Sequence, residues 1–223
     1  MTVLEELLDE YVERHRQFGV PFVKAPPVSD QEIAGVERLL GTTIPETALE
    51  LWRWSNGPGS MPEFEGKQVP ALFPNGMHFM SLKQSAEMVV ELRRLLFTGE
   101  FDDKELILDQ FGPYPSLMVA DSYETLQAVV SLSGPDAGAV WLWVSYGRGC
   151  RRCFDSVEDF VRLQLGFYEV GAVFVPDYPH PDLGYPDATV DGRDPALERL
   201  AVPDAWRIAW FTDAWDAWYG RSS

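Results

Sequence analysis

Hydrophobic residues recur every three to four positions in several stretches of the chain, which is the spacing of an amphipathic helix. The first stretch covers residues 3–18, where Leu4, Leu8 and Tyr11 fall on one side. The same spacing predicts further helices over residues 29–41, 45–55, 82–96 and 156–166. Helices therefore dominate the first hundred residues.

Residue types at the ends of the second and third helices support these boundaries. Ser29 and Glu32 have the spacing of a capping box, in which two side chains satisfy exposed amides of the first helical turn. Gly41 suits the end of that helix, and Pro45 suits the first turn of the next one. The Asn-Gly-Pro-Gly run at residues 56–59 then stops the chain from continuing as a helix. We expect a helix–turn–helix pair here.

Short apolar runs bounded by Gly and Pro predict β-strands. Residues 140–144 are apolar at every position, as in a central strand that is covered on both faces. The Gly-Pro-Asp-Ala-Gly sequence at 134–138 forms a tight turn before it. The predicted strands cover residues 69–73, 78–80, 117–120, 125–130 and 139–144.

The last quarter of the chain has a different composition. Residues 176–195 combine Pro and Asp with few apolar residues, which predicts an extended linker or a wrapping arm. Residues 203–219 then form an aromatic helix whose Trp and Phe side chains cover more than half of its circumference. Such a helix must be buried, either against its own domain or against a partner.

Composition favours a globular protein with an acidic surface. The apolar content of 46% can fill a sizeable core, and no run of about 18 apolar residues predicts a membrane helix. Eighteen Lys and Arg face 35 Asp and Glu, so the net charge is −17. This charge disfavours nucleic acid as a partner and attracts basic proteins. Acidity that serves solubility alone is the plainer alternative.

The N-terminus is charged and amphipathic and lacks the order of a secretory signal. Two cysteines are too few for a disulfide scaffold. We therefore expect a cytoplasmic protein that does not enter a membrane.

The two cysteines, Cys150 and Cys153, form a C-x-x-C motif after a predicted strand and before a helix. Ordinary thiols, a redox pair and a metal site are three possible roles, and the two arginines between the thiols would lower their pKa values. A structural zinc site needs two further ligands, and the three histidines are far apart in sequence. No motif of a hydrolase, zinc protease or nucleotide-binding enzyme is present. We expect no catalytic residues, no metal and no cofactor.

Three motifs, in this order, resemble the SUKH superfamily, which includes bacterial immunity proteins and fungal cell-wall-assembly regulators. The first is the capped helix from Val28 that leads into Ile44-Pro45. The second is the helix at 51–57 that ends in Asn-Gly, and the third is the strand at 140–144 with the helix after Ser156. Val157 stands where the family usually has an aromatic residue.

This resemblance implies an α+β fold with a twisted, mostly antiparallel sheet flanked by helices. Together with the residue patterns outside the resemblance, the chain divides into an N-terminal helix (1–25), a SUKH-like domain (26–170), and an arm with the aromatic helix (171–223). The resemblance also implies binding rather than catalysis. The leading interpretation is an immunity-type protein that neutralises a toxin domain, for example a nuclease with a basic surface. A regulatory interaction protein of the cell-wall-regulator type is the alternative, and a thiol-redox protein is a third.

The partner surface is predicted where acidic residues lie near loop tips, together with one aromatic side chain. Trp54 is ambiguous, since it is either exposed beside the Asn-Gly turn or part of a second packed layer. The predicted partner-binding residues are Asp102, Asp103, Glu105, Asp121, Asp136 and Trp54.

Overall fold

A computed structural model describes most of the chain. The described residues are 2–61, 71–97, 114–122, 126–144, 149–175, 188–190 and 194–203.

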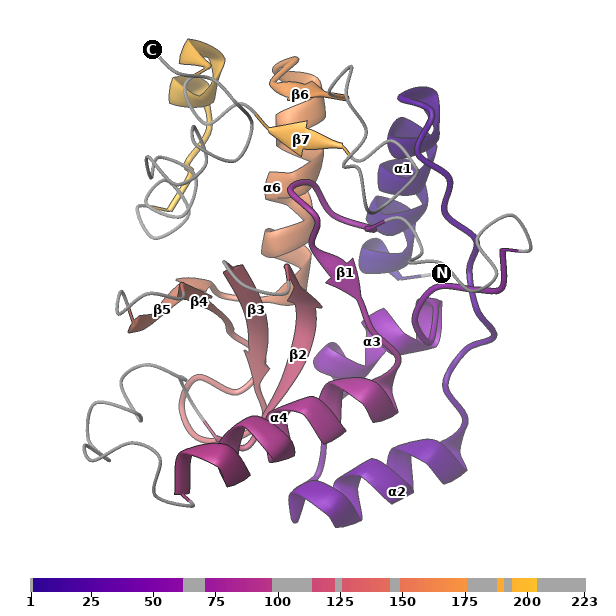
Figure 1. The fold of residues 1–223 in the computed structure, drawn as a ribbon, viewed down its shortest axis with the longest axis vertical. Helices are drawn as coiled ribbons and strands as arrows, with labels where there is room; N and C mark the ends of the chain where they lie inside the picture. Colours follow the sequence, from indigo (N-terminus) through magenta and orange to yellow (C-terminus); the bar gives the residue numbers. More distant parts are fainter. Residues whose placement is uncertain are drawn as a thin grey trace.

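The five helices predicted before residue 170 are all present (Figure 1). Both capping boxes at the first two N-termini are formed: Thr2 with Glu5, and Ser29 with Glu32. Gly41 ends the second helix with a left-handed backbone (φ +69°), as predicted. The five helices are α1 (Val3–Gln17), α2 (Asp30–Leu40), α3 (Glu46–Trp54), α4 (Leu82–Phe97) and α6 (Val157–Glu169).

A five-stranded sheet lies at the centre, and all its neighbouring strands are antiparallel. This confirms the predicted α+β fold with a mostly antiparallel sheet. The strands follow one another in space as they do in sequence: β1 (His78–Phe79), β2 (Ser116–Asp121), β3 (Leu126–Ser131), β4 (Val140–Val144) and β5 (Gly149–Phe154).

The sequence did not predict β5. The C-x-x-C motif was expected between the last predicted strand and the following helix, yet residues 149–154 form a further strand at the sheet edge. An edge strand with two adjacent arginines has no clear alternation of apolar and polar residues, so periodicity misses it. Residues 71–73 also differ from the prediction, because Phe73 makes only an isolated bridge to Met77.

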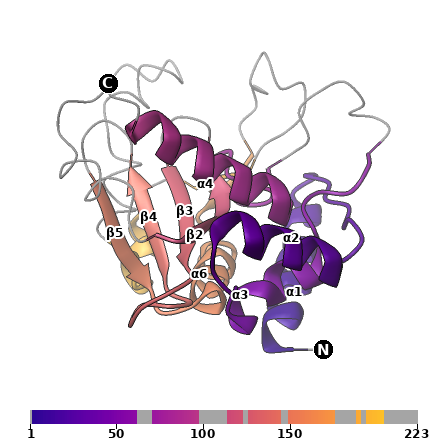
Figure 2. The same cartoon turned by 90° about the horizontal axis from the view of Figure 1, so that it is seen from below.

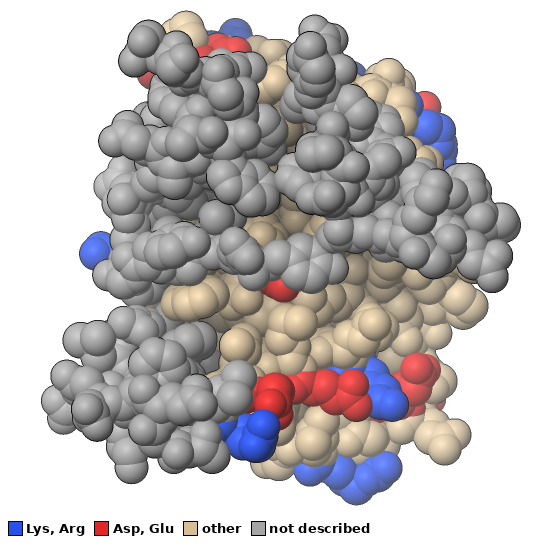
Figure 3. Space-filling view, in the orientation of Figure 1, with Lys and Arg blue, Asp and Glu red and all other residues tan. Residues whose placement is uncertain are grey.

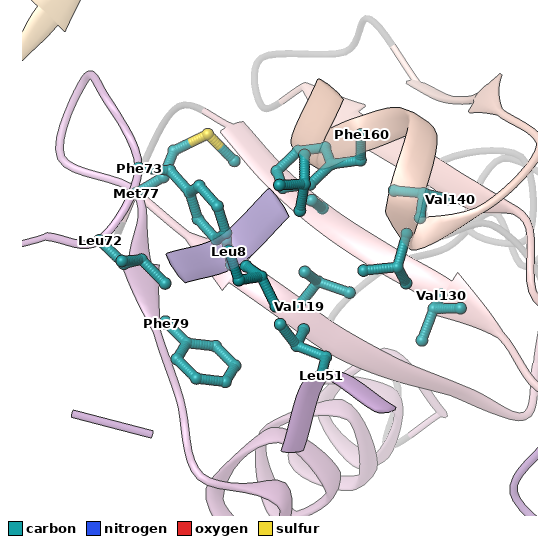
Figure 4. Close-up of a cluster of buried hydrophobic side chains, with 14 of the residues drawn as sticks. Leu8, Leu51, Leu72, Phe73, Met77, Phe79, Val119, Val130, Val140 and Phe160 are labelled. Atoms are coloured by element: carbon teal, nitrogen blue, oxygen red, sulfur yellow. The ribbon is translucent and has the colours of Figure 1, made fainter. Parts of the chain in front are cut away.

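Helices cover both faces of the sheet (Figure 2). On one face, Val89 of α4 packs against Met118 of β2 and Val129 of β3. On the other face, α6 lies over the strands, and Phe160 is fully buried there (Figure 4). The larger core lies on the α6 side and continues to α3 and α1.

The N-terminal helix shares this larger core. Leu8 and Tyr11 of α1 are fully buried, and the Tyr11 ring contacts Phe73 and Tyr168 at centroid distances of 5.5 and 5.6 Å. α1 runs alongside α6 (Figure 1). The described part of the predicted 1–25 unit is therefore packed as closely as the elements that follow it.

The Asn-Gly turn joins three helices. Asn56 accepts a hydrogen bond from the backbone amide of Leu82, the first residue of α4, and donates one to Glu32 of α2. Gly57 has φ +88°, and a Cβ there would lie 2.8 Å from the Ser81 amide nitrogen. Only glycine fits this position without displacing the chain that enters α4.

α6 extends past Gly166, which was predicted to end it, and continues to Glu169. A Cβ on Gly166 would lie 3.1 Å from the Leu200 side chain, so the missing side chain makes room for the C-terminal part of the chain. Of the predicted arm, β7 (Thr189–Val190) pairs with β6 (Val173–Phe174), and Pro195–Arg199 form a 3₁₀ helix, η2. The predicted aromatic helix lies outside the described residues from position 204 on.

Candidate protein-binding surface

Three of the predicted partner-binding residues, Asp102, Asp103 and Glu105, lie outside the described residues. They belong to residues 98–113, which hold five acidic residues and one basic residue. Their place in the interface stays a prediction.

The described residues on either side of this acidic segment contact each other. The Arg93 guanidinium of α4 lies 3.4 Å from the centre of the Tyr114 ring, a cation–π contact. The Tyr114 side chain is 40% exposed. An arginine stacked on a partly exposed tyrosine is therefore available next to this acidic segment.

The prediction for Asp121 is wrong. This residue was expected near a loop tip, but β2 extends one residue beyond the predicted strand and includes it. Asp121 is 2% exposed, and its Oδ1 accepts a hydrogen bond of 2.9 Å from Gln127, its neighbour on β3. A buried carboxylate held within the sheet is not available for direct contact with a partner.

Asp136 lies in the turn between β3 and β4 and is half-buried. The Arg152 Nε lies 3.1 Å from Asp136 Oδ1, and Arg152 Nη2 lies 2.6 Å from Asp155 Oδ1. One arginine of β5 thus ties the turn to the start of α6. Asp136 is at the surface, but part of its charge is neutralised there.

Trp54 belongs to the second packed layer and is 5% exposed. Its indole N–H donates to Asp9 Oδ1 over 2.7 Å, and the Phe22 ring stacks on it at 5.7 Å with an interplanar angle of 4°. Lys24 Nζ lies 5.0 Å from the Trp54 ring centre and 2.7 Å from the same Asp9 oxygen. Trp54 therefore fastens α3 to α1 and is not an exposed anchor.

The charge on Asp9 fits this arrangement. Partial burial alone would raise its pKa, but the hydrogen bonds from Lys24 and Trp54 and the Lys24 charge together outweigh it. The pKa of Asp9 is consequently lowered, so the carboxylate stays ionised and keeps both donors.

The two thiols lie on opposite faces of the sheet. Cys150 is opposite Trp143 in register and shares the α4 side with Trp141, whereas Cys153 packs against the larger core on the α6 side. Both cysteines are free. Burial raises the pKa of Cys150 to about 12 and that of Cys153 to about 11. The charge of Arg151 lowers the pKa of Cys153, as predicted, but burial raises it by more, and no arginine charge among the described residues acts on Cys150.

Among the described residues, the excess of acidic over basic side chains is largest in residues 2–54, which contain α1, α2 and α3. The described residues include 20 Asp and Glu against 12 Lys and Arg, and residues 2–54 contain ten of these acids and five of the bases. On the face shown in Figure 3, charges gather in a band along α4, where Lys83 pairs with Glu87 and Arg94 with Glu91. The surface directly above this band is uncharged (Figure 3).

Most described cations have a partner among the described residues, and two do not. Eight of them form ion pairs with carboxylates, Arg93 stacks on Tyr114, and Arg199 donates to backbone carbonyls. Within the described ranges, Arg38 of α2 and Arg151 of β5 have neither an ion pair nor a hydrogen bond from the side chain. The pattern of residues along the chain does not single out Arg151, because that pattern does not predict β5.

No group of three His, Cys, Asp or Glu side chains in the described ranges is arranged to hold a metal ion. In the same ranges, no helix has the length and apolar composition needed to cross a membrane. The described surface offers charged and aromatic groups suited to protein contact.

Comparison with known proteins agrees with the order of motifs along the chain. No curated protein matches the sequence. The model of the SMI1 / KNR4 family (SUKH-1) matches residues 27–163, which run from the loop before α2 into α6 and include the whole five-stranded sheet. The chain therefore belongs to the SMI1 / KNR4 family (SUKH-1).

Proposed function

We propose that the chain is an immunity-type protein that acts in the cytoplasm by binding a toxin domain and blocking it. Membership of the SUKH-1 family is the observation that carries this proposal, because the superfamily includes immunity proteins. The net charge of −17 specifies the partner further. A toxin that acts on nucleic acid needs a basic groove for phosphates, and an acidic protein can cover that groove.

The charge has a kinetic consequence in this proposal. Oppositely charged surfaces attract each other before contact, which raises the association rate at low salt. An immunity protein benefits from fast association because it must bind the toxin before the toxin reaches its substrate. The acids on α1–α3 and on residues 98–113 supply this long-range attraction.

A regulatory interaction protein is the second candidate, since the matched family carries the names of the SMI1 and KNR4 proteins. Catalysis by the thiols is a weaker candidate. The two sulfurs face opposite sides of the sheet, and their raised pKa values leave little thiolate at neutral pH. We propose binding without catalysis.

Co-expression with the toxin-like product of a neighbouring gene tests the proposal. The chain is expected to co-purify with that product and to restore growth of cells that produce it. A matched control is Leu51→Asp, which places a charge in the core and should abolish both results. If the chain is folded and bound to the toxin but the cells still die as they do without it, the proposal is contradicted. Replacing Cys150 with Ser removes any redox pair of the C-x-x-C motif and should leave the rescue unchanged.

A further inference from the structure

The edge of β5 that faces away from β4 has no partner strand among the described residues. β5 is the last strand of the sheet, and β4 is its one neighbour there. In the part of the chain that the structure describes, residues 149–153 form no backbone hydrogen bond on the side away from β4. An edge of this kind can pair with an extended segment of another protein.

Arg151 gives this edge a positive charge that no described carboxylate neutralises. Its side chain is exposed and has no carboxylate partner among the described residues, although acids outnumber bases there by 20 to 12. Arg151 lies opposite Leu142, a residue of the larger core, so it belongs to the α6 side of the sheet. The neighbouring Arg152 differs, since it is bound by Asp136 and Asp155.

A groove of about 400 Å³ adjoins the end of β5 on the same side. Cys153, Phe154, Leu163 and Ala201 give it apolar walls, and Asp159 and Arg162 lie at its polar part. When a peptide adds a strand to a sheet edge, its backbone supplies affinity and its alternate side chains enter neighbouring pockets. β5 combines both elements of such a site.

The charges on β5 select what can pair with it. Two copies of β5 that paired antiparallel about Arg151 would bring their Arg151 side chains opposite one another, and like charges directly across a strand pair are destabilising. An acidic residue on the incoming strand would instead compensate Arg151. A segment of a different protein with a carboxylate at this position therefore fits better than a second copy of this chain.

We propose that β5 accepts an extended strand of the protein partner along its open edge, with a carboxylate facing Arg151 and a nearby side chain in the groove beside Cys153. This inference rests on the proposed function, because the partner is the toxin domain. The acidic surface attracts the partner over long range, and the β5 edge fixes its position after contact.

Two charge reversals separate these roles. Arg151→Glu and Arg38→Glu each change the net charge from −17 to −19, so attraction of a basic partner is equal or stronger in both. We expect Arg151→Glu to raise the dissociation rate from the purified toxin about tenfold, which equals about 1.4 kcal/mol. Arg38→Glu, the matched control on α2, should leave that rate unchanged. Arg151→Gln should give a smaller increase, and thermal unfolding should show that all three variants are folded.

Hydrogen exchange of the complex supplies the second measurement. Amides within residues 149–153 should become protected when the toxin binds. Equal dissociation rates for Arg151→Glu and Arg38→Glu, or unchanged exchange of the β5 amides, would overturn the inference. If the toxin still binds tightly in that case, the proposed function stands. Pairing of β5 in a dimer of the free chain, seen by sedimentation and exchange, would also overturn it. If the toxin does not bind at all, the proposed function and this inference both fail.

Discussion

His15 of α1 and Tyr168 of α6 form a buried hydrogen bond with a defined direction. Nδ1 of His15 lies 2.5 Å from the Tyr168 hydroxyl oxygen, and Nε2 lies 3.0 Å from the carbonyl oxygen of Ala71. A carbonyl only accepts, so Nε2 carries the proton. Burial lowers the pKa of His15 to about 4, so the ring is neutral and Nδ1 is an acceptor. The Tyr168 hydroxyl therefore donates to His15.

Tyr168→Phe should lower the free energy of unfolding by about 1 to 3 kcal/mol, since it leaves a buried acceptor on His15 unpaired. Chemical denaturation measures this loss. A double-mutant cycle with His15→Leu isolates the pair, because the hydroxyl should matter much less once the imidazole is absent. Equal losses from Tyr168→Phe in the presence and absence of His15 would show that the hydroxyl acts elsewhere.

Stability should fall as the pH drops from about 6.5 to about 4. Burial lowers the pKa values of His15 and His78 to about 4, from an ordinary value of 6.5. The unfolded chain therefore takes up protons first, and the stabilisation present above 6.5 is lost through this range. For His15 alone the loss is on the order of 3 kcal/mol.

Denaturation at several pH values tests this dependence. His15→Gln should be less stable at pH 7 and should show a smaller slope between pH 6.5 and 5. The depressed pKa of Asp9 contributes mainly at lower pH, so this window reports the histidines. An unchanged slope in the variant would contradict the assignment.

Two helix glycines should respond differently to alanine. A Cβ on Gly35 of α2 would have only the Arg38 side chain, at 3.9 Å, within contact distance, so Gly35→Ala should stabilise the protein by about 0.5 to 1 kcal/mol. Gly166→Ala has the same gain in helix propensity but presses on Leu200 at 3.1 Å. Its net stabilisation should be clearly smaller or reversed. Thermal unfolding of both variants measures these stability changes. An equal gain for the two would mean that Leu200 moves away from the new methyl group at no cost.

Reversing the charge of the acidic segment should slow association with a basic partner. The triple variant Asp102→Lys, Asp103→Lys and Glu105→Lys changes the net charge from −17 to −11. Its association rate at low salt should fall by about tenfold, and the difference from the parent should shrink at high salt. Stopped-flow mixing with the purified partner measures both rates. Equal rates at low salt would exclude steering by these three residues.

The sequence predicted the helices and most strands because their signals are local. Ser29, Gly41 and Pro45 fix helix ends through backbone chemistry that acts within a few residues. β5 and the continuation of α6 past Gly166 depend on distant contacts. The edge strand pairs with β4, and Gly166 contacts Leu200, so neither could be inferred from a short window of sequence.

The binding residues were harder to predict than the fold. Net charge indicates a basic partner, but it cannot show that Asp121 is buried beside Gln127 or that Trp54 is covered by Phe22. Arg151 was missed for the opposite reason. An arginine without a carboxylate partner among the described residues can be recognised only after those carboxylates have been placed.

Inhibition of the purified toxin by the purified chain tests the proposed function most directly. Toxin activity should fall in proportion to added chain and reach background at one chain per toxin, and raised salt should slow the onset of inhibition. If the toxin remains fully active although the chain is present in excess and bound to it, neutralisation is contradicted. The chain would then bind the toxin without inhibiting it.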